Sequence, residues 1–274
     1  MRAIALAALI AAAPLAVQAA TFSLIDGAAE ATVSDRNGVT VWRTDGGRDN
    51  IFIGNYYVRR AGDSRELPLS EFIAEPSASQ TLNAVSLSFR DDTLEATLDT
   101  ALKGGAPGSS RSTLTRSLSL TNVGETTQSL FLFDYTDFDI RFDQLAQADQ
   151  TVQSSPGRLV TRSGSFPLTI ETVVTPEPQS WEIADFFTLY TRFFIDLDGP
   201  TTLPNTPALG APFPVPAGDN AFAFGWAFDL APGATFSVSN TSTIAPVPLP
   251  PAALLLIAGL VGLGMASRKP QSGA

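Results

Sequence analysis

The stretch Thr113-Leu114-Thr115-Arg116-Ser117-Leu118-Ser119-Leu120-Thr121 decides the fold class, because apolar and polar residues alternate along it. In an extended chain its leucines project to one side and its hydroxyl side chains to the other. Asn122-Val123-Gly124-Glu125 follows with residues typical of a turn. Residues 129–135 then resume as an apolar run typical of a strand in the middle of a sandwich. The pattern predicts two strands joined by a tight turn.

Similar short strands are predicted along the whole central region. They cover residues 39–42, 85–89, 94–98, 168–173, 222–228 and 235–239. The chain also has 21 Gly and 20 Pro, which leaves little room for long helices. Only residues 180–187 suggest one or two helical turns. We therefore predict an all-β protein, a large antiparallel β-sandwich.

The sandwich is predicted to be one domain over residues 20–246. Boundaries near residues 175–178 or in the Pro-rich stretch 200–216 are the alternatives, but neither has the composition of a linker. By analogy alone, a sheet pair of this size is similar to the two-sheet supersandwich of sugar-interacting proteins.

The N-terminus reads as a secretory signal peptide over residues 1–19. Arg2 precedes an apolar stretch over residues 3–17, and small residues follow at Ala19 and Ala20. We expect cleavage after Ala19 and export of the sandwich.

The C-terminus combines rigid prolines, an apolar run and a basic pair. After Val247-Pro248-Leu249-Pro250, residues 252–266 carry no charge, and Arg268-Lys269 follow. As a helix the run is about 23 Å long, short of the ~30 Å hydrocarbon core. The basic pair predicts that residues 270–274 form a cytoplasmic tail behind a short transmembrane helix.

These tail residues resemble the VPLPA-CTERM variant of the PEP-CTERM sorting signal of Gram-negative bacteria over residues 247–269. The sequence departs from the pattern at Pro251, where the motif has Ala. The resemblance implies processing by an exosortase near the motif, a transient membrane anchor, and final placement at the cell surface or in the exopolysaccharide matrix. It covers about a tenth of the chain and implies nothing about the sandwich.

Composition excludes several functional classes. With 17 Lys and Arg against 27 Asp and Glu, the net charge is −10. Removing Arg2, Arg268 and Lys269 brings the exported part to about −13, so nucleic-acid binding is excluded. The chain has no His and no Cys, which rules out a Ser-His-Asp triad, a histidine-ligated zinc site and disulfides. From this shortage we predict a non-enzymatic surface protein without a resident cofactor.

One acidic cluster stands out as a metal-site candidate. Asp134, Asp137 and Asp139 lie close together in sequence, and a calcium ion would offset their mutual repulsion. A solvated strand face without an ion is the alternative interpretation, and a two-carboxylate glycoside hydrolase or lyase is a third.

Four aromatic residues are candidates for contacts with a glycan, because flat, exposed Trp and Tyr rings stack on sugars. They are Trp42, Tyr56, Tyr57 and Trp181. Packing in the core is the alternative for each. They support a second hypothesis, an exopolysaccharide-binding sandwich that acts with or without calcium.

Overall fold

A computed structural model describes residues 19–73, 76–140, 149–163, 167–195, 199–210 and 219–247. Residues 1–18 of the expected signal peptide lie outside this part of the chain. So do residues 248–274, which hold the expected transmembrane helix. Within the described ranges, none of the helices has the length and apolar character needed to cross a bilayer. The targeting signals at both ends therefore remain predictions.

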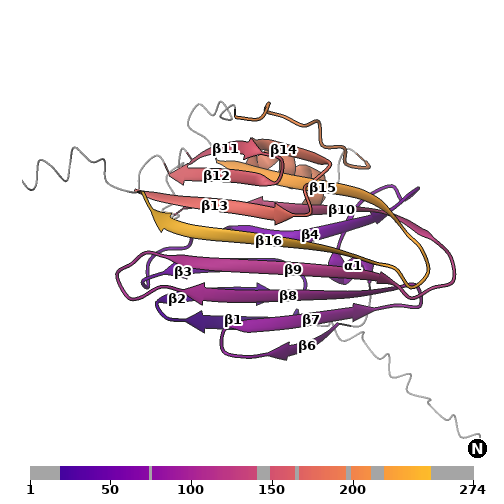
Figure 1. The fold of residues 1–274 in the computed structure, drawn as a ribbon, viewed down its shortest axis with the longest axis horizontal. Coiled ribbons are helices and arrows are strands. Elements are labelled where there is room, and N and C mark those ends of the chain that lie inside the picture. The colour runs from indigo at the N-terminus through magenta and orange to yellow at the C-terminus, as the bar shows by residue number, and fades with distance from the viewer. Residues whose placement is uncertain are drawn as a thin grey trace, which may run out of the picture.

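The described residues form a two-layer sandwich (Figure 1), which confirms the predicted all-β fold. Sheet A has the strand order β1-β2-β3-β4-β10-β15-β14, with β5 paired to β4. Its strands are β1 (Thr21–Asp26), β2 (Ala29–Ser34), β3 (Gly38–Thr44), β4 (Ile53–Arg60), β5 (Leu67–Pro68), β10 (Gln128–Asp137), β14 (Ser180–Asp185) and β15 (Asn220–Leu230).

Sheet B has the strand order β11-β12-β13-β16-β9-β8-β7-β6. Its strands are β6 (Ser77–Gln80), β7 (Ala84–Arg90), β8 (Leu94–Gly104), β9 (Ser112–Asn122), β11 (Asp149–Ser155), β12 (Arg158–Ser163), β13 (Leu168–Thr175) and β16 (Thr235–Pro246). The stretch that predicted the fold is β9, whose long partners β8 and β16 flank it. All pairings between the strands are antiparallel.

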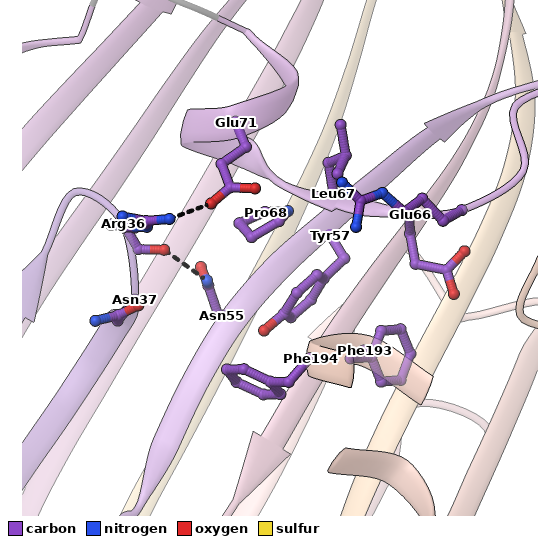
Figure 2. A pocket seen from close by; sticks show the side chains of 11 residues that line it. Arg36, Asn37, Asn55, Tyr57, Glu66, Leu67, Pro68, Glu71, Phe193 and Phe194 are labelled. Carbon is purple, nitrogen blue, oxygen red and sulfur yellow. Dashed lines mark hydrogen bonds and ion pairs between the residues drawn. The ribbon is translucent and has the colours of Figure 1, made fainter. Parts of the chain in front are cut away.

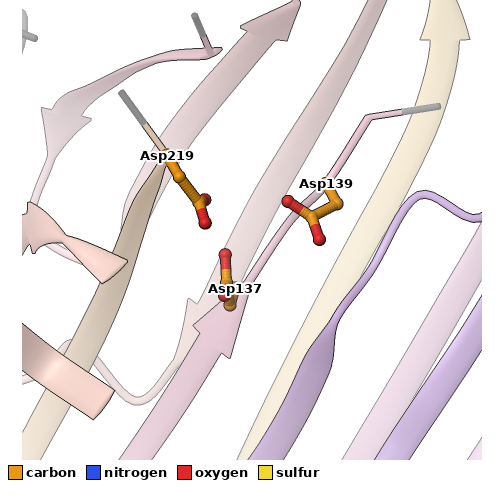
Figure 3. A group of neighbouring side chains, drawn as sticks. All are labelled: Asp137, Asp139 and Asp219. Atoms are coloured by element: carbon orange, nitrogen blue, oxygen red, sulfur yellow. The ribbon is translucent and has the colours of Figure 1, made fainter. Parts of the chain in front are cut away.

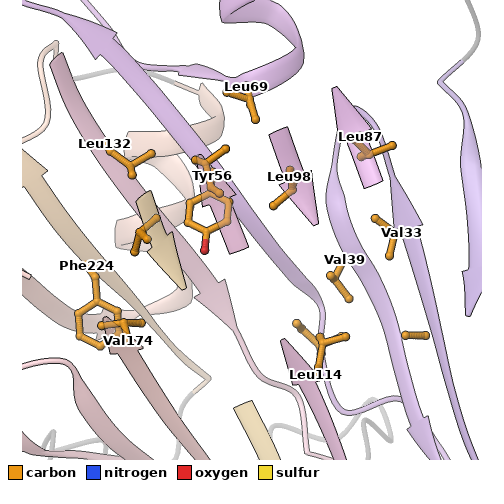
Figure 4. Packing of buried hydrophobic residues seen from close by; sticks show 14 of the residues in the cluster. Val33, Val39, Tyr56, Leu69, Leu87, Leu98, Leu114, Leu132, Val174 and Phe224 are labelled. Carbon is orange, nitrogen blue, oxygen red and sulfur yellow. The ribbon is translucent and has the colours of Figure 1, made fainter. Parts of the chain in front are cut away.

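The two halves of the sequence are interleaved in both sheets. In sheet A, β10 lies between β4 and β15, and in sheet B, β16 lies between β9 and β13. Strands that precede residues 175–178 therefore lie beside strands that follow them in each sheet. A single continuous core fills the space between the sheets, with Leu114, Tyr56 and Phe224 among its members (Figure 4).

A buried ion pair crosses this core. Arg116 of β9 donates to the carboxylate of Asp134 on β10 at 2.7 Å and to the Thr136 hydroxyl at 2.8 Å. Asn240 of β16 donates to the other oxygen of Asp134 at 2.7 Å. These contacts link sheet B to sheet A and satisfy the Asp134 charge away from water.

Among the described residues, three short helical segments lie outside the sheets: α1 (Leu69–Phe72), α2 (Phe186–Tyr190) and the π-helix η1 (Thr191–Ile195). The predicted helix over residues 180–187 is wrong for most of its length, because β14 pairs with β15 through Asp185. Helix α2 begins only at Phe186, where the Asp185 carboxylate accepts a hydrogen bond from the Thr188 backbone N–H.

Candidate functional site

Three carboxylates converge at one end of sheet A. Asp137 is the last residue of β10, Asp139 follows two residues later, and Asp219 directly precedes β15. The antiparallel register pairs Asp137 with Ala221, which brings Asp219 alongside. One oxygen from each carboxylate lies within 4.8 Å of the others, and Figure 3 shows the three groups pointing toward one another. We call Asp137, Asp139 and Asp219 the carboxylate trio.

The surroundings of the trio favour protonated carboxyls. Burial, followed by the charges of Asp219 and Asp49, raises the pKa of Asp139 to about 7. The pKa of Asp219 is also raised, by burial and then by the charge of Asp185. Burial raises the pKa of Asp49 too, although backbone N–H donors oppose it. A carboxyl whose pKa lies near neutrality is a group suited to general acid–base chemistry.

A buried tyrosine faces the trio. Tyr135 projects from the same face of β10 as Asp137, two residues away, and has no exposed surface. Among the described residues its hydroxyl has no hydrogen-bond partner. Burial and then the charge of Asp137 raise the pKa of Tyr135, and Asp219 adds to the effect. A polar group without a partner inside a protein is costly, which is one signature of a site that receives a ligand or water.

The cover over this part of sheet A is aromatic. Phe193 of η1 packs against Tyr57 at 5.1 Å and against Tyr135 at 5.4 Å between ring centroids. Phe194 lies 5.7 Å from Tyr57 and 5.8 Å from Tyr135. The segment α2–η1 therefore closes the outer face of sheet A above the two tyrosines.

A cavity of about 220 Å³ opens beside this cover. Figure 2 shows Tyr57, Phe193 and Phe194 on one side of it and the Arg36–Glu71 ion pair, at 2.7 Å, on another. The Asn55 amide also lines the cavity and donates to the Arg36 carbonyl at 3.1 Å. Charged, amide and aromatic groups around a small volume suit a polar ligand of about one ring, since drug-sized ligands need roughly 300–1,000 Å³.

The predicted calcium cluster needs one correction. Asp134 does not join Asp137 and Asp139, because alternation along β10 points it into the core, where Arg116 and Asn240 hold it. Asp219 takes its place. Sequence reasoning missed Asp219, since only the pairing of β15 with β10 brings it near Asp137; its position just before a predicted strand was the one available signal.

The four aromatic candidates are dispersed. Trp42 and Tyr56 have no exposed surface and pack in the core between the sheets, so they form no exposed sugar platform. Trp181 is half-buried at the edge of the same core and donates to the Pro207 carbonyl at 3.3 Å. Tyr57 alone lines the cavity, where burial raises its pKa.

Comparison with solved structures identifies the fold. A protein assigned as an aldose 1-epimerase from Escherichia coli K12 superimposes with a TM-score of 0.54 at 12% identity, over 84% of this chain and 100% of that one. A galactose mutarotase related enzyme from Lactobacillus acidophilus gives 0.53 at 8% identity, over 84% and 100%. A galactose mutarotase-like protein from Lactobacillus casei gives 0.52 at 9%, over 82% and 100%. No protein-family model matches the chain, and neither does any curated protein.

These matches contradict the prediction of a non-enzymatic domain. That prediction was inferred from the lack of His and Cys, yet the similar structures include proteins named as enzymes that act on sugars. The lack of His and Cys excludes particular catalytic groups and leaves carboxylates and tyrosines available. At these identities the likeness shows the β-sandwich fold and nothing finer.

Proposed function

We propose that this chain is an exported, carbohydrate-active β-sandwich that binds an aldose unit at the outer face of sheet A. In this proposal the carboxylate trio exchanges protons with the bound sugar. The observation that carries it is the convergence of Asp137, Asp139 and Asp219 beside the Tyr135 hydroxyl, in a fold shared with aldose 1-epimerase-type structures.

The proton chemistry of an aldose ring fits two neighbouring carboxyls. A base removes the proton of the anomeric hydroxyl while an acid protonates the ring oxygen, and the bond between that oxygen and the anomeric carbon breaks. Closure of the open-chain aldehyde on its other face reverses both transfers and inverts the anomeric centre. Asp139, with its pKa raised to about 7, suits the acid, and a second carboxyl of the trio would act as the base in its ionised form.

Sugar recognition would draw on the groups around the cavity. Asn55 and the Arg36–Glu71 pair offer donors and acceptors for sugar hydroxyls, and the rings of Phe193 and Phe194 offer an apolar side. Tyr57 lines the cavity, and its ring lies 6.5 Å from the ring of Tyr135, which shares a face of β10 with Asp137.

Isothermal titration of the purified full-length protein with a panel of aldoses tests the binding step. We expect the dissociation constant for an aldose to differ at least threefold between the Asp139→Asn variant and the wild type. The substitution replaces a carboxylate oxygen acceptor and removes the titrating proton. Asp92→Asn is the matched control, since Asp92 is exposed in the turn between β7 and β8, away from the site. Absence of heat for every sugar with the wild-type protein would overturn the proposal.

Calcium binding by the trio is the second candidate. Three carboxylate oxygens within 4.8 Å are a donor set that Ca²⁺ accepts, and the ion would relieve their mutual repulsion. The geometry favours Asp219 over Asp134 as the third ligand. Titration with CaCl₂ after chelator treatment separates the candidates: heat that disappears in Asp219→Asn supports the ion, and no heat in the wild type excludes it.

The site of action follows from the terminal signals. With a signal peptide over residues 1–19 and an exosortase-type tail from Val247, the sandwich would reach the cell surface or the surrounding exopolysaccharide. Membrane contact through residues 252–266 would last until processing. Free aldoses and the reducing ends of such a polymer carry the anomeric hydroxyl that the proposed proton transfer requires.

A further inference from the structure

The outer face of sheet B carries an ordered array of hydroxyl groups. Neighbouring positions of β9 and β16 are Ser or Thr wherever the side chain points away from the core, and each facing pair is hydrogen-bonded. The five pairs are Thr113–Thr243 (3.1 Å), Thr115–Thr241 (3.4 Å), Ser117–Ser239 (3.0 Å), Ser119–Ser237 (2.9 Å) and Thr121–Thr235 (2.8 Å). We call these ten residues the hydroxyl ladder.

The ladder extends sideways across the sheet. Ser119 also pairs in register with Thr97 of β8, Thr97 with Ser88 of β7, and Ser88 with Ser77 of β6. One row of hydroxyls therefore crosses five strands. The ladder itself spans two strands and is about 27 Å long at a side-chain repeat of about 6.8 Å, and the single row through Ser119 extends roughly 19 Å across five strands that lie about 4.8 Å apart. On β8 this row is flanked by the outward-facing side chains of Glu95 and Asp99.

This face is open. The residues between the ladder positions, such as Leu118 and Val238, are buried in the core, so the hydroxyls point outward. In Figure 1 the strands β16, β9, β8 and β7 face the viewer, and within the described part of the chain no helix or strand lies over them.

The donors, acceptors and charge of the ladder indicate which class of ligand it could bind. Each pair uses one O–H group internally, which leaves the second O–H as an outward donor and several oxygen lone pairs as acceptors. The ten residues include no charge, no aromatic ring and no large aliphatic side chain, so they lack the apolar centre of a protein interface. A molecule with a net charge of −10 and an uncharged array does not attract an anionic polymer.

We propose that the hydroxyl ladder is a docking surface for an extended, neutral polysaccharide. Such a chain presents hydroxyl and ring oxygens that both donate and accept, repeated along its length. The ladder would hold the polymer by many weak hydrogen bonds. This proposal is independent of the acid–base site, which lies on the outer face of the other sheet.

Depletion of the full-length protein from solution by microcrystalline cellulose tests the ladder. The test variant carries Thr115→Val, Ser117→Ala, Ser239→Ala and Thr241→Val, which removes two pairs while keeping strand-compatible side chains. We expect roughly tenfold weaker retention than for the wild type. The control variant carries Ser23→Ala and Thr32→Val, a facing pair on the outer face of sheet A, and should bind as the wild type does.

Three results would overturn the proposal. The first is that cellulose does not retain the wild-type protein. The second is that cellulose retains the ladder variant as well as the wild type, although the variant's melting temperature is unchanged. The third is that the wild type forms a dimer which the ladder variant loses, while both proteins are retained equally. The last would assign the face to a second copy of the chain. Aldose binding measured on the same variants separates this test from that of the proposed function, since the ladder variant should retain it.

Discussion

Burial raises the pKa of both Asp134 and Asp139, but the groups around the two carboxyls differ. Asp134 keeps its position because Arg116, Thr136 and Asn240 bond to it, whereas Asp139 is surrounded by other acids and its pKa rises to about 7. The first arrangement stabilises the fold. The second costs stability when Asp139 is ionised, which is typical of a functional site.

The raised pKa of Asp139 predicts a pH-dependent stability. Between its ordinary value of 3.8 and about 7 the folded state binds more protons than the unfolded state, so the free energy of unfolding falls as pH rises through this window. In Asp139→Asn this contribution is absent, and the variant should be about 1–3 kcal/mol more stable than the wild type at pH 8, after allowance for solvent screening. Urea unfolding of the wild type and of Asp139→Asn at pH 4.5 and pH 8 measures these free energies of unfolding. If the free energy changes equally with pH in the two proteins, the raised pKa does not belong to Asp139.

Removal of one partner of the buried Arg116–Asp134 ion pair should lower the free energy of unfolding strongly. Arg116→Met leaves the Asp134 charge buried without its cation and should cost about 3–5 kcal/mol. Arg90→Met is the matched control, because its pair with Glu95 is exposed and should change stability by less than about 1 kcal/mol. Chemical denaturation of both variants measures their free energies of unfolding. Equal losses of stability in the two variants would show that burial of the Arg116–Asp134 pair has no special role.

At the scale of elements, the α2–η1 segment covers part of the outer face of sheet A. Phe193 is buried against Tyr57, Phe133 and Tyr135, while Phe187 on the same segment is 65% exposed. Phe193→Ala should destabilise the protein by about 3–5 kcal/mol, and Phe187→Ala by no more than about 0.5 kcal/mol. Thermal unfolding tests both. Similar effects of the two substitutions would mean that the segment does not pack on sheet A as described.

Strands were predictable where alternation is regular, and their partners were not. The pattern over residues 113–121 fixed β9 and its turn, because one face is uniformly apolar and the other carries mainly hydroxyls. The strand β14 was read as helix, since its preference is set by pairing with β15 and not by its own residues. The same limit explains Asp219: Asp137 and Asp139 are near each other in sequence, but Asp219 joins them only through long-range pairing.

The whole molecule presents two chemically different outer faces. Sheet A carries acids, tyrosines and a small cavity under an aromatic cover, and sheet B carries an open, uncharged array of hydroxyls. We propose that one face acts on a free aldose or a reducing end, while the other face holds a neutral polysaccharide.

Processing of both ends is a prediction for the whole chain in its native host. Terminal-peptide mass spectrometry should find a mature N-terminus at Ala20 and a C-terminus near Pro250 or Pro251. Recovery of an intact Arg268-Lys269 tail from the membrane fraction would contradict exosortase processing and leave a permanently anchored protein.

The central claim is that the carboxylate trio acts on an aldose, and exchange NMR between the α and β anomers measures this most directly. The wild-type protein should accelerate interconversion of at least one aldose, with a rate that depends on a group titrating near pH 7. Asp139→Asn should reduce the acceleration by about 10²–10⁴-fold, and Asp92→Asn should leave it unchanged. An uncatalysed rate for every sugar in the wild type, or an equal rate in Asp139→Asn, would contradict the account.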